Sequence, residues 1–299
     1  MAAGRIMVKE HPFQFTAIGT DWEIDTVQPI DQELREDICR LAEDFDRVWS
    51  RFRADSLVSC IARAEAGGRF DFPVRDVALF ELYDRLSAAT DGAVDPLVGR
   101  DLELLGYDAH YSLIADHAAI TARGQRDSWL ATVRRTGTTI TTDLPIVIDI
   151  GAAGKGHLVD LIAYALYDAG IESFVVDGSG DLRHRGPDPL VVGLEHPTRP
   201  DRVIGTVPLR DAALCASAAN RRTWGSGLHH LLDGRTGRPV SGVVATWAIT
   251  GDAATADALA TALFVAEPEC LDGFTFSWVR MLADGRVQWS NNFDGELFL

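Results

Sequence analysis

The feature that most constrains this chain is a strand, glycine turn and helix pattern in residues 146–170, which read IVIDIGAAGKGHLVDLIAYALYDAG. Residues 146–150 are apolar apart from Asp149, which predicts a buried strand. Glycines follow, and apolar side chains then recur at helical spacing up to the closing Gly170. Glycine lets a ligand approach the backbone, while Lys155 and the helix N-terminus supply positive charge. The pattern therefore predicts a site for a phosphate-bearing ligand.

The glycine turn has two alternative interpretations. A P-loop is disfavoured, because G-x-x-G-K-G is two residues too short and has Gly156 where a P-loop has the Ser or Thr that holds magnesium. A glycine-rich connection with a surface lysine stays open as the second interpretation. Asp149 weakens it, since a carboxylate on an apolar strand is costly unless it has a partner.

The charge balance and hydropathy pattern exclude several classes of partner. A formal net charge of −16 argues against a general nucleic-acid surface, since a polyanion would be repelled before contact. An anionic ligand therefore needs a local cationic pocket. No run of about 18 to 20 apolar residues occurs, so we expect no membrane insertion. Residues 1–15 lack the apolar run of a secretory signal, so we expect a cytoplasmic protein.

The cysteines give no sign of a metal site or a disulfide framework. The chain has 4 of them, at Cys39, Cys60, Cys215 and Cys270, and they form no C-x-x-C pair. We expect reduced thiols, most of them buried.

The chain is organised as one continuous domain. Its 299 residues contain no internal repeat and no linker long enough to separate independent units. Hydrophobic periodicity predicts a strand over residues 13–26, an amphipathic helix over 31–48 and a further helix over 77–90. Residues 129–142 are expected to form strands with tight turns.

A second informative segment is the nearly all-apolar helix expected over residues 253–266. Asp257 and Thr261 are four residues apart and therefore share one face of this helix. A buried carboxylate needs a cation or hydrogen-bond donors, and a carboxylate with a hydroxyl suits magnesium better than zinc. Two alternatives stay open: the face is exposed to solvent, or Asp257 pairs with an arginine.

A third segment, residues 228–242, is a structured loop that follows a short strand. Two turn signals and Pro239 prevent a helix here. His229 and His230 are adjacent in a strand and face opposite ways, so at most one should enter a pocket. Arg235 is equally suited to bind a phosphate or to lie on the surface.

A fourth segment, residues 90–108, is expected to form a rigid turn. This turn either contacts a nucleobase or closes a lobe.

Taken in order, these segments resemble the ApbE family of FAD:protein FMN transferases. The family patterns are an early GT strand, DGAFDPT, DLGGIAKGYAVD, VNIGGD, HHIIDPRTG and ADALATALFV. Their counterparts here are residues 17–22, 91–97, 149–160, 175–181, 229–237 and 256–265. The resemblance covers about residues 15–270. It implies a mixed α+β fold, with a single catalytic domain over residues 1–299 whose two intimate lobes have the active site in the cleft between them.

The resemblance also implies a reaction and a set of site residues. The reaction is the magnesium-dependent transfer of FMN from FAD to a threonine of an acceptor protein, through a phosphoester bond, with release of AMP. The implied magnesium ligands are Asp257, Thr261 and the main-chain oxygen of Ala152, and His230 and Asp257 are the implied catalytic residues. His230 or a carboxylate near the metal takes the hydroxyl proton. The implied FAD contacts are Ile18, Phe52, Ala93, Val94, Asp95, Asp149, Lys155 and Leu231.

This chain departs from the family pattern at several positions. Residues 216–220 replace a Thr-Ser-Gly-aromatic motif, and Gly234 stands where the family has proline. Ile18 and Phe52 replace a methionine and a tyrosine. Many relatives are exported lipoproteins, whereas no such leader is visible here, so the acceptor is expected in the cytoplasm or facing it.

The alternative functions are an FAD pyrophosphatase that gives FMN and AMP, a non-catalytic FAD-binding carrier, and a structural or interaction protein without flavin.

Overall fold

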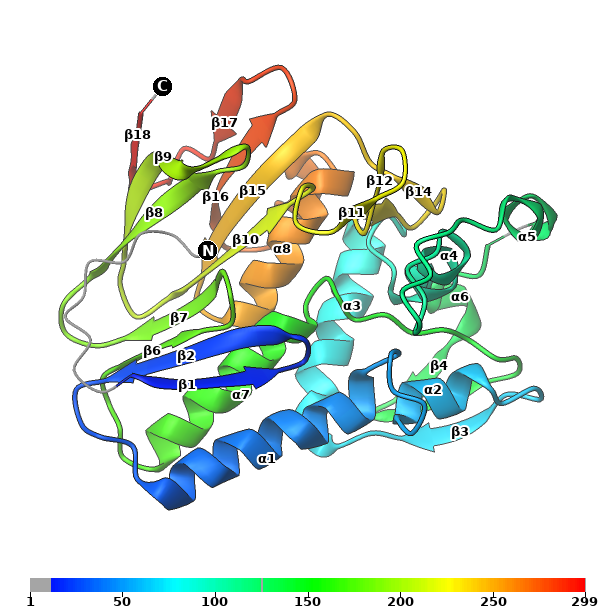
Figure 1. The fold of residues 1–299 in the computed structure, drawn as a ribbon, viewed down its shortest axis with the longest axis horizontal. Helices are drawn as coiled ribbons and strands as arrows, with labels where there is room; N and C mark the ends of the chain where they lie inside the picture. Colours follow the sequence, from blue (N-terminus) through cyan, green and yellow to red (C-terminus); the bar gives the residue numbers. More distant parts are fainter. Residues whose placement is uncertain (1–11, 125, 299) are drawn as a thin grey trace.

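An eight-stranded antiparallel sheet forms the largest element of the fold, in the order β1-β2-β6-β7-β10-β15-β16-β17. The computed structural model describes residues 12–124 and 126–298, and Figure 1 shows their arrangement. The strands are β1 Phe13–Ala17, β2 Thr20–Thr26, β6 Phe174–Asp177, β7 Asp181–Arg185, β10 Ala213–Ala218, β15 Val243–Thr250, β16 Ser277–Leu282 and β17 Val287–Trp289.

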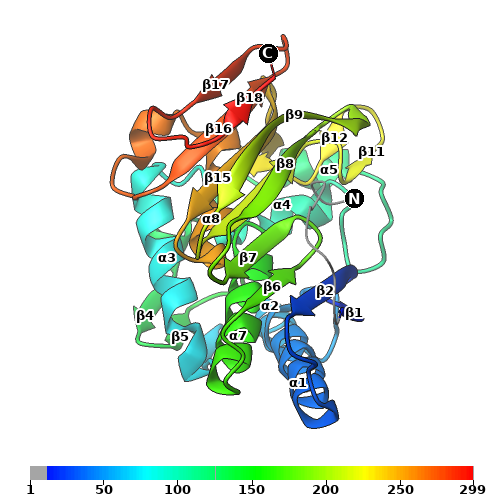
Figure 2. The ribbon, with the colours of Figure 1, turned by 90° about the vertical axis from the view of Figure 1, so that its left-hand side faces the viewer.

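The two faces of this sheet bury two different hydrophobic clusters. On one face lie the helices α1 (Gln32–Trp49), α7 (Gly154–Asp168) and α8 (Ala253–Val265). On the other lies a three-stranded sheet of β8 (Leu190–His196), β9 (Arg199–Leu209) and β18 (Glu296–Leu297), as Figure 2 shows. Neighbouring residues of a strand point to opposite faces, so Val175 packs against β8 and β9 while Val176 packs against the helices.

The remaining elements form a second lobe, on the right in Figure 1. Its helices are α2 (Leu57–Ala62), α3 (Val77–Ala89), α4 (Gly99–Leu104), α5 (His117–Ala122) and α6 (Trp129–Thr132), with the turns η1 (Val74–Asp76) and η2 (Pro96–Val98). Its small sheet has the order β3-β5-β4, from Gly68–Asp71, Thr139–Thr142 and Arg134–Thr136. The turn η3 (Pro268–Leu271) follows α8.

The segment that contains the two adjacent histidines forms two short strand pairs. They are β11 (Thr223–Trp224) with β12 (Leu228–His229), and β13 (Leu232–Asp233) with β14 (Arg238–Pro239).

Several sequence predictions are confirmed by these elements. The predicted mixed α+β architecture is present, and α1, α3 and α8 match the helices expected over residues 31–48, 77–90 and 253–266. Side-chain caps explain where two of them begin. Asp31 accepts a hydrogen bond of 2.9 Å from Leu34 N before α1, and Asp252 accepts one of 2.8 Å from Thr255 N before α8.

Other predictions are wrong in detail. The strand expected over residues 13–26 is broken into β1 and β2 by a turn at Ile18 and Gly19, whose φ angles are 45° and 75°. Residues 146–150 are mostly buried but form no strand. Asp149 N instead donates to Pro96 O at 2.8 Å, so this segment meets a turn of the second lobe and not a sheet edge. The stretch 129–142 begins with the short helix α6 before β4 and β5.

The cysteine expectation also needs correction, because Cys215 is buried whereas Cys39, Cys60 and Cys270 are exposed. Within residues 12–124 and 126–298, no helix is long and apolar enough to cross a bilayer. Residues 1–11, which include most of the segment judged to lack a secretory signal, lie outside the described part of the chain.

Candidate functional site

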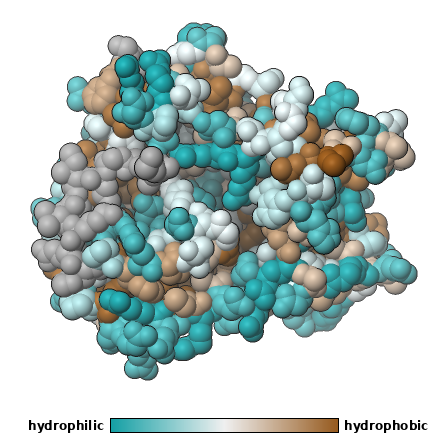
Figure 3. Space-filling view, viewed as in Figure 1, coloured by the Kyte–Doolittle hydropathy of each residue, from teal (hydrophilic) through white to brown (hydrophobic). Residues whose placement is uncertain are grey.

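A large pocket opens where the two lobes meet, with a volume of about 1040 Å³. Figure 3 shows a hollow near the middle of this face, with hydrophobic side chains inside its rim. The structure brings every predicted site residue to this one pocket, although they come from segments far apart in the sequence. They are Ile18, Phe52, Ala93, Val94, Asp95, Asp149, Ala152, Lys155, His230, Leu231, Asp257 and Thr261.

Lys155 and Asp257 line one side of the pocket, and Asp181 is buried next to Lys155. Lys155 lies in the first turn of α7, and its Nζ is 2.9 Å from Asp181 Oδ2 and 2.8 Å from Gly178 O. Asp257 projects from α8, and its Oδ2 accepts a hydrogen bond of 2.9 Å from Gly156 N. A Cβ on Gly156 would lie 2.1 Å from Ala253 O, so only glycine lets the two helices approach this closely.

The cluster of Lys155, Asp181 and Asp257 holds more negative than positive charge. Burial raises the pKa of the Asp257 carboxyl well above its usual range, the charge of Asp181 raises it further, and Lys155 opposes both. Asp181 is completely buried, and within the described residues its Oδ1 accepts no hydrogen bond. Neither alternative to a cation site at Asp257 fits the structure. Its side chain is buried, and the groups that act on it within the described residues are Asp181, Lys155 and the amide of Gly156, none of them an arginine.

The oxygen atoms around Asp257 are suited to a hard cation. Thr261 lies one helical turn further along α8, and its Oγ1 is 3.5 Å from Ser217 Oγ on β10. Ala152 lines the same pocket. A carboxylate, a hydroxyl and a main-chain carbonyl are ligands that magnesium prefers. Among the described residues, no group of three or more His, Cys, Asp or Glu side chains could hold a metal ion, so a cation here would depend on one carboxylate together with hydroxyl and main-chain oxygens.

Asp149 lies where the chain enters the glycine turn. Its Oδ1 accepts a hydrogen bond of 2.7 Å from Gly151 N, and its Oδ2 is 2.6 Å from Arg51 Nε. Burial alone raises the pKa of Asp149, but Arg51 and these hydrogen bonds outweigh it and hold the pKa below its ordinary value. The carboxylate is therefore charged, and its position is fixed from two sides.

Only one of the two adjacent histidines enters the pocket, as expected, although β12 ends at His229 and His230 lies just outside the strand. His230 lines the pocket, whereas His229 Nε2 is 2.9 Å from Val240 O and is absent from the lining. Burial lowers the pKa of His230 to about 4, and the positive charge of Arg222 contributes to the shift. The imidazole is therefore neutral near pH 7 and is able to accept a proton.

Arg235 does not line the pocket. It pairs with Asp233 at 2.7 Å, so the surface role holds for this residue.

Two predicted flavin contacts, Ile18 and Asp95, lie in tight turns of the chain. Ile18 is β-branched yet has φ 45°, a strained conformation that is found most often at functional sites. Asp95 lines the pocket, but Oδ1 accepts from Leu97 N and Oδ2 from Trp129 N, both at 2.8 Å. Asp95 therefore orders its own turn with one carboxylate oxygen and ties that turn to the start of α6 with the other.

The family departure at Gly234 has a local explanation. Gly234 N donates to Ala93 O at 2.8 Å, a hydrogen bond that proline is unable to make. A Cβ at this position would lie 2.4 Å from Gly92 O. The glycine therefore ties the histidine loop to the turn before η2. No contact in the structure explains the replacement of methionine by Ile18.

Sequence reasoning missed Arg51, which lines the pocket, and Asp181, which is buried beside Lys155. Asp181 ends the matched segment 175–181, and Arg51 directly precedes Phe52, so both positions carried a signal. It also missed an aromatic group beside Phe52. Tyr111 stacks on Phe52 with ring centroids 5.1 Å apart, and Tyr107 stacks on Trp224 at 5.4 Å.

Comparisons with known proteins find one matching family and several similar sequences. The family model described as "ApbE family" matches residues 18–275. Two similar proteins, each named FAD:protein FMN transferase, are from Rhodobacter capsulatus and Vibrio cholerae. The first is 28% identical and the match covers 92% of this chain; the second is 27% identical and the match covers 83%. The chain spans about half of the Rhodobacter protein (53%) and 79% of the Vibrio protein.

Solved structures show the same fold. The flavin transferase ApbE from Vibrio cholerae aligns with a TM-score of 0.81 and 24% identity, over 97% of this chain and 98% of that one. The ApbE protein from Thermotoga maritima aligns with a TM-score of 0.82 and 26% identity, over 95% and 98% of the two chains.

Proposed function

Because the chain belongs to the ApbE family, we propose that it is a magnesium-dependent FAD:protein FMN transferase, which moves FMN from FAD to a threonine of an acceptor protein and releases AMP. One observation carries the proposal. The residues that the family resemblance singles out, scattered between Ile18 and Thr261 in the sequence, line a single pocket of about 1040 Å³. A pocket of this size suits a dinucleotide better than a small phosphate ester.

Asp257, Thr261 and the main-chain oxygen of Ala152 would hold the magnesium ion. The fit rests on the buried excess of negative charge, since Asp257 and Asp181 share one lysine and Asp181 Oδ1 has no hydrogen bond within the described residues. A cation offsets a charge that is otherwise costly to bury. When bound, magnesium neutralises charge on the pyrophosphate.

The chain's own residues supply binding and proton transfer. Lys155, in the first turn of α7, favours the anionic pyrophosphate together with the helix N-terminus. Neutral His230 accepts the proton of the acceptor threonine as the hydroxyl oxygen bonds to the phosphorus on the FMN side. The bond from that phosphorus to the AMP oxygen breaks, AMP leaves, and FMN stays on the threonine as a phosphoester. We prefer His230 to a carboxylate as the base, because the carboxylates are committed to Lys155 and the cation.

The test uses FAD, magnesium and a panel of candidate acceptors that includes one labelled in parallel by the Vibrio cholerae relative. The proposal predicts a fluorescent flavin band on an acceptor after denaturing electrophoresis, and AMP in equal amount in solution. The Asp257→Asn variant serves as the inactive control. Free FMN plus AMP without a labelled acceptor would make the protein an FAD pyrophosphatase. Tight FAD binding without turnover would make it a carrier, and absence of FAD binding would reject a flavin function altogether.

A further inference from the structure

Arg51 is a buried cation that the proposed chemistry does not use. Its side chain is only 3% exposed, although arginine is usually a surface residue. Nε is 2.6 Å from Asp149 Oδ2, and Nη1 donates to Tyr107 O at 2.7 Å. Nη2 makes no hydrogen bond within residues 12–124 and 126–298. A buried arginine with a purely structural role is expected to satisfy all of its donors, so this placement calls for another explanation.

The guanidinium of Arg51 joins two sides of the pocket. Its edge binds the carboxylate of Asp149, which in turn holds Gly151 N at the start of the glycine turn. Its central carbon lies 4.2 Å from the centroid of the Phe52 ring and 5.0 Å from that of Tyr107. A planar cation is suited to both contacts at once, since it binds carboxylate through its edge and stacks on aromatic rings.

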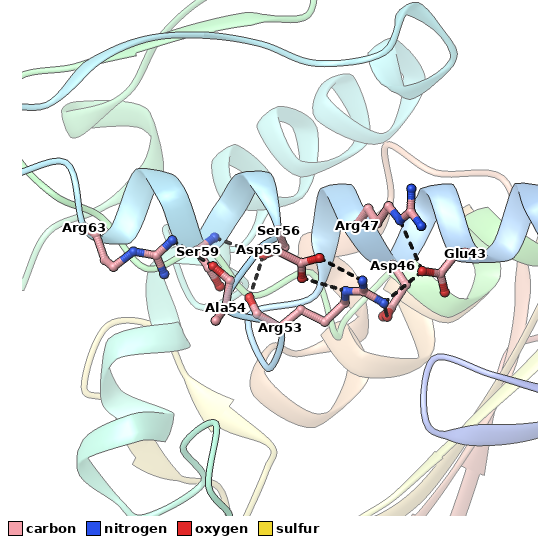
Figure 4. A network of polar contacts seen from close by, with 9 residues as sticks. All are labelled: Glu43, Asp46, Arg47, Arg53, Ala54, Asp55, Ser56, Ser59 and Arg63. Carbon is pink, nitrogen blue, oxygen red and sulfur yellow. Dashed lines mark hydrogen bonds and ion pairs between the residues drawn. The ribbon is translucent and has the colours of Figure 1, made fainter.

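The turn that carries Arg51 and Phe52 is fixed by a separate polar network, shown in Figure 4. Arg53 contacts Glu43 at 3.1 Å, Asp46 at 3.2 Å and Asp55 at 3.0 Å, and so links the end of α1 to the start of α2. Ser56 caps α2 by accepting a hydrogen bond of 3.1 Å from Ser59 N. The backbone of the turn is therefore held independently, and Arg51 is left to orient side chains in the pocket.

We propose that Arg51 is a positioning residue, which couples Asp149 to Phe52 so that the glycine turn and the aromatic side of the pocket bind FAD as one unit. This inference rests on the proposed function, because it takes Asp149 and Phe52 as FAD contacts. It goes further in assigning a specific role to a residue outside the predicted set.

The experiment is a double-mutant cycle on FAD affinity, measured by calorimetric titration of the full-length protein. Phe52→Leu and Asp149→Asn are made singly and together, in the presence of Arg51 and again in the Arg51→Met background. With Arg51 present, the two substitutions should be non-additive by about tenfold in Kd, the size expected for residues joined in one interaction network. In the Arg51→Met background, the fold-changes in Kd caused by Phe52→Leu and Asp149→Asn should simply multiply, as they do for independent sites. Arg51→Met alone should weaken FAD binding by about tenfold or more.

Arg135→Met is the matched control. Arg135 is also a partly buried arginine that pairs with a carboxylate, Asp84, and lies 5.9 Å from an aromatic ring, Phe80, but it does not line the pocket. It should lower the melting temperature and leave the Kd for FAD within about twofold of the wild type, the error usual for independent sites. Arg51→Lys keeps the charge and loses the planar stack, so it should fold and retain only part of the coupling.

The outcomes separate this inference from the proposed function. A wild-type protein that binds no FAD rejects the proposed function. A wild-type protein that binds FAD, with the same coupling between Phe52 and Asp149 whether or not Arg51 is present, rejects the positioning role alone. Equal loss of FAD affinity in Arg51→Met and Arg135→Met would also reject it, since the effect would then follow from general destabilisation. All affinities are measured well below the melting temperature of each variant.

Discussion

Replacing Asp257 by asparagine tests whether this carboxylate binds a cation or only stabilises the fold. Asn keeps the size of Asp257 and can still accept the hydrogen bond from Gly156 N, which is 2.9 Å long in the structure. It removes one of the two carboxylates that share Lys155, so Asp181 and Lys155 remain as a balanced pair. Transfer should fall by about 10³-fold or more, because a bound metal ion contributes several kcal/mol to stabilising the transition state.

The same substitution should not destabilise the protein without magnesium. The pKa of Asp257 is raised in the folded protein, so ionisation of this carboxyl opposes folding. The contribution of the protonated form to stability is fully present below the pKa of the unfolded chain. It is lost as the pH rises through the pKa of the folded protein. Asparagine resembles that protonated form at every pH. At pH 7 we therefore expect an unchanged or higher melting temperature, with a gain in stability of up to about 1–4 kcal/mol.

Two further variants make the comparison specific. Thr261→Ala should reduce transfer by only about tenfold, since water can complete the shell of magnesium when a neutral ligand is lost. Asp160→Asn is the structural control, because Asp160 is also buried but accepts hydrogen bonds from Ala253 N and Ala254 N at the start of α8. It should cost about 0.5–2 kcal/mol of stability, as loss of a cap does.

The assay is thermal unfolding and flavin transfer on the same preparations, over a series of magnesium concentrations. Destabilisation of Asp257→Asn by about 3–5 kcal/mol would show that Asp257 belongs to a structural ion pair. Normal transfer by this variant, with no dependence on magnesium, would equally refute the cation site.

Three other predictions concern the pocket. Lys155→Ala should abolish transfer and also lower the melting temperature, because the variant leaves the fully buried Asp181 without its cation. The double variant Lys155→Ala with Asp181→Asn should regain the melting temperature but not the transfer activity. Because the pKa of His230 is about 4, kcat/KM should stay high as the pH falls through 6.5 and decline only near pH 4. Arg222→Met should move this decline to higher pH, since the charge of Arg222 helps to lower the pKa. A decline at pH 6.5 in the wild type would remove His230 as the buried base. FAD should bind more tightly than FMN in a calorimetric titration, since the proposed contacts, all of which line one pocket, would involve both halves of the dinucleotide. Equal affinities would remove the adenylate from the proposal.

Sequence reasoning found the features that are encoded locally. The helix over residues 253–266 and the amphipathic helix over 31–48 follow from periodicity, and a carboxylate within an apolar helix indicates that a partner is needed. Ordered weak motifs then gave a set of pocket residues, and the structure brings all of them to one cavity.

Long-range contacts are what the sequence did not reveal. Arg51 and Asp149 are 98 positions apart, and no local pattern indicates that they form an ion pair. Residues 146–150 have the composition of a strand but form none, and the amide of Asp149 donates to Pro96 O instead. The break at Ile18 was missed because a β-branched residue is rarely found at positive φ.

The most direct test of the account is intact-mass and peptide mass spectrometry of an acceptor protein incubated with this chain, FAD and magnesium. The account predicts one FMN added through a phosphoester to a threonine, one AMP released for each FMN attached, and neither product with Asp257→Asn or without magnesium. Release of AMP together with free FMN, while the acceptor stays unmodified even though the Vibrio cholerae relative labels it, would contradict the transferase assignment.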